Sequence, residues 1–199
     1  MSTSEYPTVL DLVGGTPLVR LQRVGSELGP TLLAKLEYMN PGGSVKDAEV
    51  IAAADLLKTD WGVDADLWGC PSFTELARDG NAVARRNMLH PGEKSIVSHV
   101  EQCLAATEGP VIAATDYIRA YAEQIRAFVP RRYTALGTDG FGRSDTREKL
   151  RHFFEVDRHW VVLAALKALA DEGKMPASKA AEAMKKYGLA ADKPAPWTV

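Results

Sequence analysis

Two short apolar runs separated by a helical segment constrain the fold of this 199-residue chain more than any other feature. The run PVIAAT (110–115) is almost wholly apolar, which is typical of a strand buried on both faces of a parallel sheet. The run RYTALG (132–137) favours a second strand, and the apolar residues at 117–129 between the two runs have helical spacing. Because strands alternate with helices, we predict an α/β sandwich of three layers, with helices on both faces of a mostly parallel sheet.

The remaining predicted elements follow from apolar spacing and from residues that begin or end helices. A run at 31–39 favours a short strand, and the apolar stripe that follows residue 44 favours a helix ending near Trp61 and Gly62. The further elements are a strand at 64–70, a helix capped by Ser72, a helix capped by Asp145 together with Glu148, and helices at 160–170 and 177–187, the last stopped by Gly188.

Composition and charge exclude several classes of partner. The formal net charge is -2 and the pI is about 6.1, so we expect no nucleic-acid partner. The longest apolar stretch, at 160–166, is far too short to cross a bilayer, and the first residues, MSTSEYPTV, show no secretory signal. Cys70 and Cys103 lie in no metal-binding pattern and are expected to be reduced thiols. These features predict a cytoplasmic protein without membrane contact.

A glycine-rich loop, GTDGFGRSD (137–145), is a candidate anion site because it joins a predicted strand to a predicted helix. Gly140 and Gly142 would expose backbone amides, and Arg143 would add a cation that favours phosphate or carboxylate. The loop lacks the GxxxxGK[ST] pattern, and its glycine spacing is not GxGxxG. We therefore favour a structural turn and keep the anion site as the alternative.

Two histidines are the only arrangement that suggests a metal. His152 and His159 are seven residues apart with Asp157 between them, so one helix could align them. No HExxH motif or third ligand accompanies them, and their aromatic neighbours are typical of the edge of a core. We expect no metal site.

Two spaced motifs near the N-terminus carry a resemblance to a known family. VGGTPLVRL (13–21) and AKLEYMNPGGSVKD (34–47) resemble the N-terminus of cysteine synthase and cystathionine β-synthase, which are pyridoxal-phosphate enzymes. The resemblance implies that Lys46 forms the internal aldimine with the cofactor. Ala48 stands where that family usually has arginine, and the family's later cofactor loops are not found here. We therefore favour a solvated lysine at a helix start, with pyridoxal phosphate on Lys46 as the alternative.

The rest of the chain resembles a different family. The stretches DWGVDADLW, SFTELARDG, NMLHPGE, ATDYIRAYAEQIRAFVP and LGTDGFGRSDTREKLRHFFEVD resemble the C-terminal domain of the homodimeric pyruvate dehydrogenase decarboxylating component, a transketolase-like enzyme. The resemblance covers about three quarters of the chain, and GTDGFGRSDTRE is its most specific motif. In that family thiamine diphosphate and magnesium are held by two preceding domains. The resemblance thus implies a transketolase C-terminal-like fold with no cofactor in this chain alone.

The two resemblances meet near residue 48, so we interpret the chain as a chimera. Residues 1–48 would be an arm like the start of a pyridoxal-phosphate enzyme, and residues 49–199 a transketolase C-terminal-like domain. The segment TLLAKLE would replace a missing first strand of the domain. Leu32, Leu33 and Leu36 would then face packed helices.

Three hypotheses for function follow. The first is a C-terminal domain fragment of the pyruvate dehydrogenase component that serves structure and dimer contacts and does not catalyse alone. Its partners would be a second copy and the other components of the dehydrogenase complex. The second is a remnant of a pyridoxal-phosphate lyase or synthase that uses Lys46. The third is an oligomerisation module without a small ligand. Whether the chain is an enzyme stays open.

Overall fold

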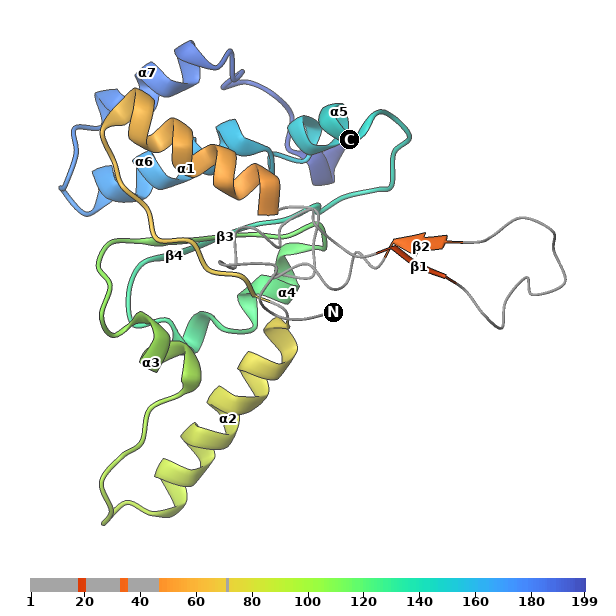
Figure 1. The fold of residues 1–199 in the computed structure, drawn as a ribbon. Helices are drawn as coiled ribbons and strands as arrows, with labels where there is room; N and C mark the ends of the chain where they lie inside the picture. The colour runs from red at the N-terminus through yellow and green to blue at the C-terminus, as the bar shows by residue number, and fades with distance from the viewer. Residues whose placement is uncertain (1–17, 21–32, 36–46, 71) are drawn as a thin grey trace, which may run out of the picture. The chain divides into compact units, whose positions relative to one another are not determined.

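The computed structural model describes residues 18–20, 33–35, 47–70 and 72–199 (Figure 1). The chain divides into two units, one of residues 1–48 with 67–71 and the other of residues 49–66 with 72–199. The first division falls between Ala48 and Glu49, where the two resemblances meet. That residues 1–48 form a domain of their own stays a prediction.

The second unit is built on a parallel pair of strands, β3 (Val111–Ala114) and β4 (Tyr133–Leu136). Val111 lies opposite Tyr133, and successive side chains of each strand point to opposite faces. Ile112 accordingly packs into one apolar cluster, whereas Ala113 packs into another. The side chains of β3 are half-buried, so this strand is covered less completely than its sequence predicts.

One face of this sheet is covered by three helices that come from both ends of the unit. They are α1 (Asp47–Trp61), α6 (Arg158–Asp171) and α7 (Ser178–Lys186) (Figure 1). Their shared core consists of Ala53, Leu57, Val161, Val162, Ala165, Leu166, Ala180 and Ala183. Leu166 and Val162 are completely buried, so α6 lies at the centre of this layer.

The opposite face is covered by the segments between α1 and β4. They are α2 (Phe73–Leu89), α3 (His99–Leu104), α4 (Arg119–Glu123) and the short 3-10 helix η4 (Arg126–Phe128). Their core consists of Ala77, Val100, Leu104, Ala122, Ile125, Val129, Tyr133 and Ala135. The Tyr133 hydroxyl, buried in this layer, donates to the carbonyl of Ala122 at 2.7 Å. Two helical layers thus enclose the parallel pair, which confirms the predicted three-layer α/β architecture.

Helix ends follow the capping residues in the sequence. The Ser72 hydroxyl accepts from the backbone N–H of Glu75 at 3.2 Å and so caps α2. Gly62 after α1 and Gly188 after α7 have φ of 66° and 65°, a conformation that glycine adopts without steric cost. These predicted boundaries are confirmed.

Two predicted elements differ from the structure. Residues 64–70 form no strand; Leu67 and Trp68 are neighbours, so a strand would turn them to opposite faces, and both are exposed. The single helix predicted at 117–129 is two short pieces, α4 and η4. The backbone N–H groups of Tyr121, Ile125 and Phe128 each donate a hydrogen bond to the carbonyl of the third residue before them. These turns are therefore tighter than those of an α-helix, which has 3.6 residues per turn.

The cap of α5 (Arg147–Phe153) lies one residue later than predicted. The Thr146 hydroxyl accepts from the N–H of Lys149 at 3.4 Å, whereas Asp145 accepts from the N–H of Thr146 at 2.7 Å. The expected capping box of Asp145 with Glu148 is therefore wrong. Both Asp and Thr suit this position, and the local sequence alone does not choose between them.

The first unit contains the antiparallel pair β1 (Leu18–Arg20) and β2 (Leu33–Lys35), with Val19 opposite Ala34. The predicted short strand at 31–39 therefore exists at Leu33–Lys35, where it pairs with β1 in a two-stranded sheet. That the segment TLLAKLE replaces a first strand of the domain stays a prediction. Lys46, Leu32 and Leu36 lie outside the described residues, and the side chain of Leu33 is not described.

Candidate functional site

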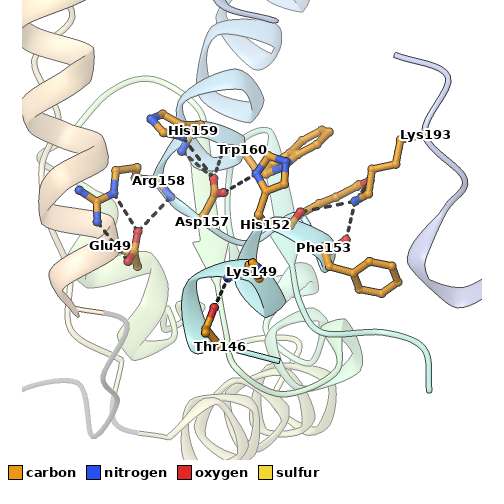
Figure 2. A network of polar contacts seen from close by, with 11 residues as sticks. Glu49, Thr146, Lys149, His152, Phe153, Asp157, Arg158, His159, Trp160 and Lys193 are labelled. Carbon is orange, nitrogen blue, oxygen red and sulfur yellow. Dashed lines mark hydrogen bonds and ion pairs between the residues drawn. The ribbon is translucent and has the colours of Figure 1, made fainter. Parts of the chain in front are cut away.

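The polar network in Figure 2 includes a carboxylate at the start of α1. Glu49 is only 9% exposed. Its Oε1 accepts from Arg151 Nη1 at 3.1 Å and from Arg158 Nη2 at 3.3 Å. Its Oε2 accepts from Arg158 Nε at 3.1 Å and from the backbone N–H of Arg158 at 3.2 Å. Four donors from the α5–α6 region therefore satisfy one carboxylate of α1.

The two arginines fix the charge of Glu49. Burial by itself would raise the pKa of this carboxyl, but the hydrogen bonds and charge of Arg158, with the charge of Arg151, outweigh burial and lower the pKa below its ordinary value. A carboxylate that stays ionised at neutral pH cannot act as a general acid there, and its lowered pKa makes it a weak base. Because protein donors already bind both oxygens, the arrangement of Glu49 suits a structural role rather than proton transfer.

Asp157 fastens the start of α6 in the same network. Its Oδ1 accepts from the backbone N–H groups of His159 and Trp160 at 2.9 and 3.1 Å, which is the geometry of an N-cap. Its Oδ2 lies 2.9 Å from His152 Nδ1. The His159 ring stacks on Tyr187, with centroids 4.7 Å apart, and its Nδ1 lies 4.0 Å from Asp157 Oδ1. The two histidines thus flank one carboxylate.

No three His, Cys, Asp or Glu side chains of the described residues are grouped as metal ligands would be. The carboxylate between His152 and His159 is occupied with helix capping, as Figure 2 shows. The absence of a metal site stays a prediction from the sequence.

Lys193 ties the C-terminal segment to the same network (Figure 2). Its ammonium donates to the carbonyl of Phe153 and, at 3.1 Å, to Glu155 Oε1. It also lies 5.2 Å from the ring centroid of Phe153 and 5.3 Å from that of Trp160, within cation–π range. The network therefore joins α1, α5, α6 and the chain end of this unit through paired charges.

The carboxyl ends of the two parallel strands form the second candidate, because α/β sheets place their ligand sites there. Arg119 donates to Asp139 Oδ2 from Nε at 2.8 Å and from its backbone N–H at 3.2 Å. The Thr138 hydroxyl donates to the carbonyl of Asp116 at 2.8 Å. The loops that follow β3 and β4 are thus held together by their own polar groups.

Close backbone packing at this edge explains why Gly137 is a glycine. A Cβ there would lie 2.5 Å from the backbone nitrogen of Arg119 and 2.7 Å from the carbonyl of Tyr117. Gly137→Ala is therefore expected to lower the free energy of unfolding by about 1–3 kcal/mol, measured by urea denaturation. Gly142→Ala in the same loop is the control, because nothing lies within 4 Å of its added Cβ. Equal midpoints for the two variants would contradict the close packing.

The predicted anion-site residues lie in one loop, and two of them contact other parts of the domain. Gly140 has φ of 126°, and a Cβ there would lie 2.6 Å from the carbonyl of Pro196, so the loop rests on the turn η5 (Pro196–Thr198). The Arg143 guanidinium lies 4.3 Å from the ring centroid of Phe153. An anion site at Gly140, Gly142 and Arg143 stays a prediction, and these contacts favour the structural turn.

An open cavity of about 270 Å³ lies elsewhere on the same unit, lined by Thr107, Glu108, Gly109, Arg131, Glu172 and Lys174. Arg131 donates to the carbonyls of Leu104 and Thr107, and Lys174 pairs with Glu172 at 3.1 Å. Arg131 is thus a half-buried side chain that holds two segments together. The cations of this cavity have protein partners already.

Sequence reasoning missed most of the network. Glu49, Arg151, Arg158 and Lys193 were not singled out. One signal was present in the sequence, because Glu49, Ala53 and Leu57 are spaced by four residues and so lie on one face of a helix. All three are buried in the structure. A carboxylate on the apolar face of a helix predicts a buried partner of opposite charge.

Residues 34–157 match the family of transketolase-like TK C-terminal domains. Three relatives are pyruvate dehydrogenase E1 components. The one from Cupriavidus necator is 72% identical over 151 residues, which cover 76% of this chain and 17% of the relative. The one from Pseudomonas aeruginosa is 62% identical over 146 residues (73% and 17%), and the one from Escherichia coli K12 is 46% identical over 160 residues (80% and 18%).

These matches support one of the two resemblances. The family match begins at residue 34 and so includes residues 34–47 of the stretch that resembles cysteine synthase. The cysteine synthase part of the chimera is not shown and stays a hypothesis. The chain spans about a sixth of the length of the curated relatives it matches. Because the match at residues 34–157 covers more than half of the chain, this chain belongs to the family of transketolase-like TK C-terminal domains.

Proposed function

We propose that residues 49–199 are the C-terminal domain of a pyruvate dehydrogenase E1 component. This domain has a role in structure and assembly, and by itself it does not catalyse the reaction. The observation that carries this proposal is the 72% identity to the Cupriavidus necator E1 component over 151 residues. A domain with this identity is expected to take the same place in a larger enzyme.

The polar groups of the domain support a structural role. Glu49 and Asp157 are each satisfied by donors of neighbouring helices, and Arg119 is held by Asp139. Groups satisfied in this way stabilise the fold but are not poised to take up protons or to attack a substrate. In this proposal these groups hold neighbouring helices and loops together.

The E1 activity would belong to the whole polypeptide. In the relatives the matched stretch is about a sixth of the chain, so the proposal places thiamine diphosphate and magnesium with the remaining part. A second E1 subunit and the other components of the dehydrogenase complex are the proposed partners. A cytoplasmic location stays a prediction. Within the described residues no helix combines the length and apolar character that crossing a membrane requires.

A domain replacement tests the proposal. The matching stretch of the Cupriavidus necator E1 component is replaced by residues 49–199 of this chain, and pyruvate decarboxylation is measured with thiamine diphosphate and magnesium. We expect the hybrid to be active, because the replaced stretch is 72% identical. A hybrid that folds but does not decarboxylate pyruvate would contradict the proposal.

The isolated chain gives a second expected result. Thiamine diphosphate with magnesium at millimolar concentration should leave its melting temperature unchanged. Specific binding at a hundredfold excess over the dissociation constant would add about 2.7 kcal/mol of stability. A domain of this size would then melt roughly 5–10 °C higher. Differential scanning fluorimetry measures the shift, and a clear increase would show that the chain itself holds the cofactor.

The pyridoxal-phosphate alternative is kept apart from this proposal. It concerns Lys46, which lies outside the described residues. The appropriate measurement is visible absorbance with added pyridoxal phosphate, compared with the Lys46→Ala variant. A saturable band that the variant loses would favour the alternative.

A further inference from the structure

A group of large apolar side chains is exposed at the carboxyl ends of β3 and β4. We name it the aromatic edge; its members are Tyr117, Ile118, Tyr121, Phe141 and Trp197. Each is between 45% and 76% exposed. Single exposed apolar residues are ordinary, but a contiguous group of this size marks a surface that another molecule covers.

Contacts between the segments show that the aromatic edge is contiguous. The rings of Tyr117 and Tyr121 lie 5.2 Å apart. Arg119, between them in the sequence, places its guanidinium 4.6 Å from the ring centroid of Trp197. The segment that carries Phe141 packs against the backbone of Trp197, because a Cβ on the preceding Gly140 would lie 3.3 Å from the Cα of Trp197. Three segments far apart in sequence thus form one surface.

The aromatic edge is held in place by hydrogen bonds beneath it. Tyr117 accepts from the N–H of Thr138 at 2.9 Å and donates its own N–H to the Thr115 hydroxyl at 3.2 Å. Asp139 holds Arg119 through two further hydrogen bonds. A surface that is formed in advance loses little conformational entropy when a partner covers it.

The residue types agree with a protein partner. Tyrosine, tryptophan and arginine are the residues most enriched among those that dominate binding energy at protein interfaces. The charge of Arg119 is already balanced by Asp139, so the surface needs an apolar partner rather than a charged one. An apolar protein surface fits this chemistry.

We infer that the aromatic edge docks onto the remaining part of a pyruvate dehydrogenase E1 polypeptide; this inference rests on the proposed function. The proposed partner follows from the length of the relative that lies outside the match. The matched stretch is 17% of the Cupriavidus necator relative, so most of that polypeptide lies outside the match. A covalently joined partner is present at high effective concentration, which favours it over a second copy of the chain.

A second exposed apolar group provides matched controls. Met88, Leu89, Ile96 and Val97 lie at the end of α2 and in the segment that follows it. Met88 is 70% exposed and Phe141 is 76% exposed, so the two side chains start from similar accessibility. The second group lacks aromatic rings and lies outside the loops at the carboxyl ends of the strands.

The experiment compares the free chain with the active E1 hybrid described above. Hydroxyl-radical labelling is followed at Phe141, Trp197 and Met88 by mass spectrometry. We expect labelling of Phe141 and Trp197 to fall severalfold in the hybrid, while labelling of Met88 stays unchanged. Phe141→Ser should lower the melting temperature of the hybrid and leave that of the free chain unaltered, because the ring is uncovered there. Met88→Ser should alter neither.

Each other outcome overturns the inference in a recognisable way. Equal labelling of Phe141 in the free chain and in an active hybrid would refute the docking surface and leave the proposed function standing. Protection that appears in the free chain at high concentration would assign the surface to a second copy. A folded but inactive hybrid would overturn the proposed function and the inference together.

Discussion

Glu49→Ala is expected to lower the free energy of unfolding by about 3–5 kcal/mol, the range for removing one partner of a buried ion pair. The substitution removes the carboxylate that lies 3.1 Å from Arg151, whose side chain is 11% exposed. It also removes the acceptor of the backbone N–H and side chain of Arg158. The thermal midpoint of a chain of this size should fall by roughly 2–4 °C per kcal/mol. Urea denaturation and calorimetry measure both quantities.

Glu75→Ala is the matched control for this prediction. Glu75 pairs with Arg78 at 2.9 Å, but both side chains are mostly exposed. Exposed pairs contribute at most about 1 kcal/mol, so this variant should unfold almost as the parent does. Similar losses of unfolding free energy in the two variants would contradict the prediction that the buried ion pairs of Glu49 stabilise the fold.

The pH dependence of the Glu49 effect has a definite sign. Its pKa is lowered in the folded chain below the ordinary value of 4.5. The stabilisation from its charge is therefore fully present above the unfolded pKa and is lost as the pH falls through the folded pKa. The difference in stability between the parent and Glu49→Gln should be constant near neutral pH and shrink at acid pH. A difference that does not change with pH would show that packing, not charge, carries the effect.

Leu166→Ala is expected to cost about 2–5 kcal/mol, because it opens a cavity in the layer formed by α1, α6 and α7. Leu166 is completely buried in the cluster that also contains Val162 and Leu57. Leu89→Ala removes the same atoms from a side chain that is 52% exposed and serves as the control. Equal denaturation midpoints for the two variants would contradict the central position of α6.

The elements that sequence reasoning placed correctly are those whose signal is local. The apolar runs at 110–115 and 132–137 become β3 and β4, and the alternation of strands and helices predicts the layers. Ser72 caps α2 because its hydroxyl reaches an amide three residues away. Gly188 ends α7 because its own φ is positive. Each of these features depends on residues within a few positions of one another.

The parts that sequence reasoning missed depend on distant partners. Glu49 and Arg158 are 109 residues apart, so no window of sequence shows that one satisfies the other. The pairing of β2 with β1 also depends on a second strand, which the sequence of β2 alone does not identify. The helix predicted at 117–129 was lost to tighter turns, a local choice that apolar spacing does not report. Tertiary contacts therefore decide the place of Glu49, whereas the turns at 117–129 are a local exception.

The long reach of α1 has a consequence for synthesis on the ribosome. Glu49 and Trp61 bind residues that follow them by 109 and 126 positions. At roughly 5–20 residues per second, the partners of this helix are translated about 5–25 seconds after it. During this interval Ala53 and Leu57 have no α6 or α7 to cover them. The first helix of this unit to be synthesised is thus among the last to be packed. Its apolar stripe stays open to chaperones until α7 has been synthesised.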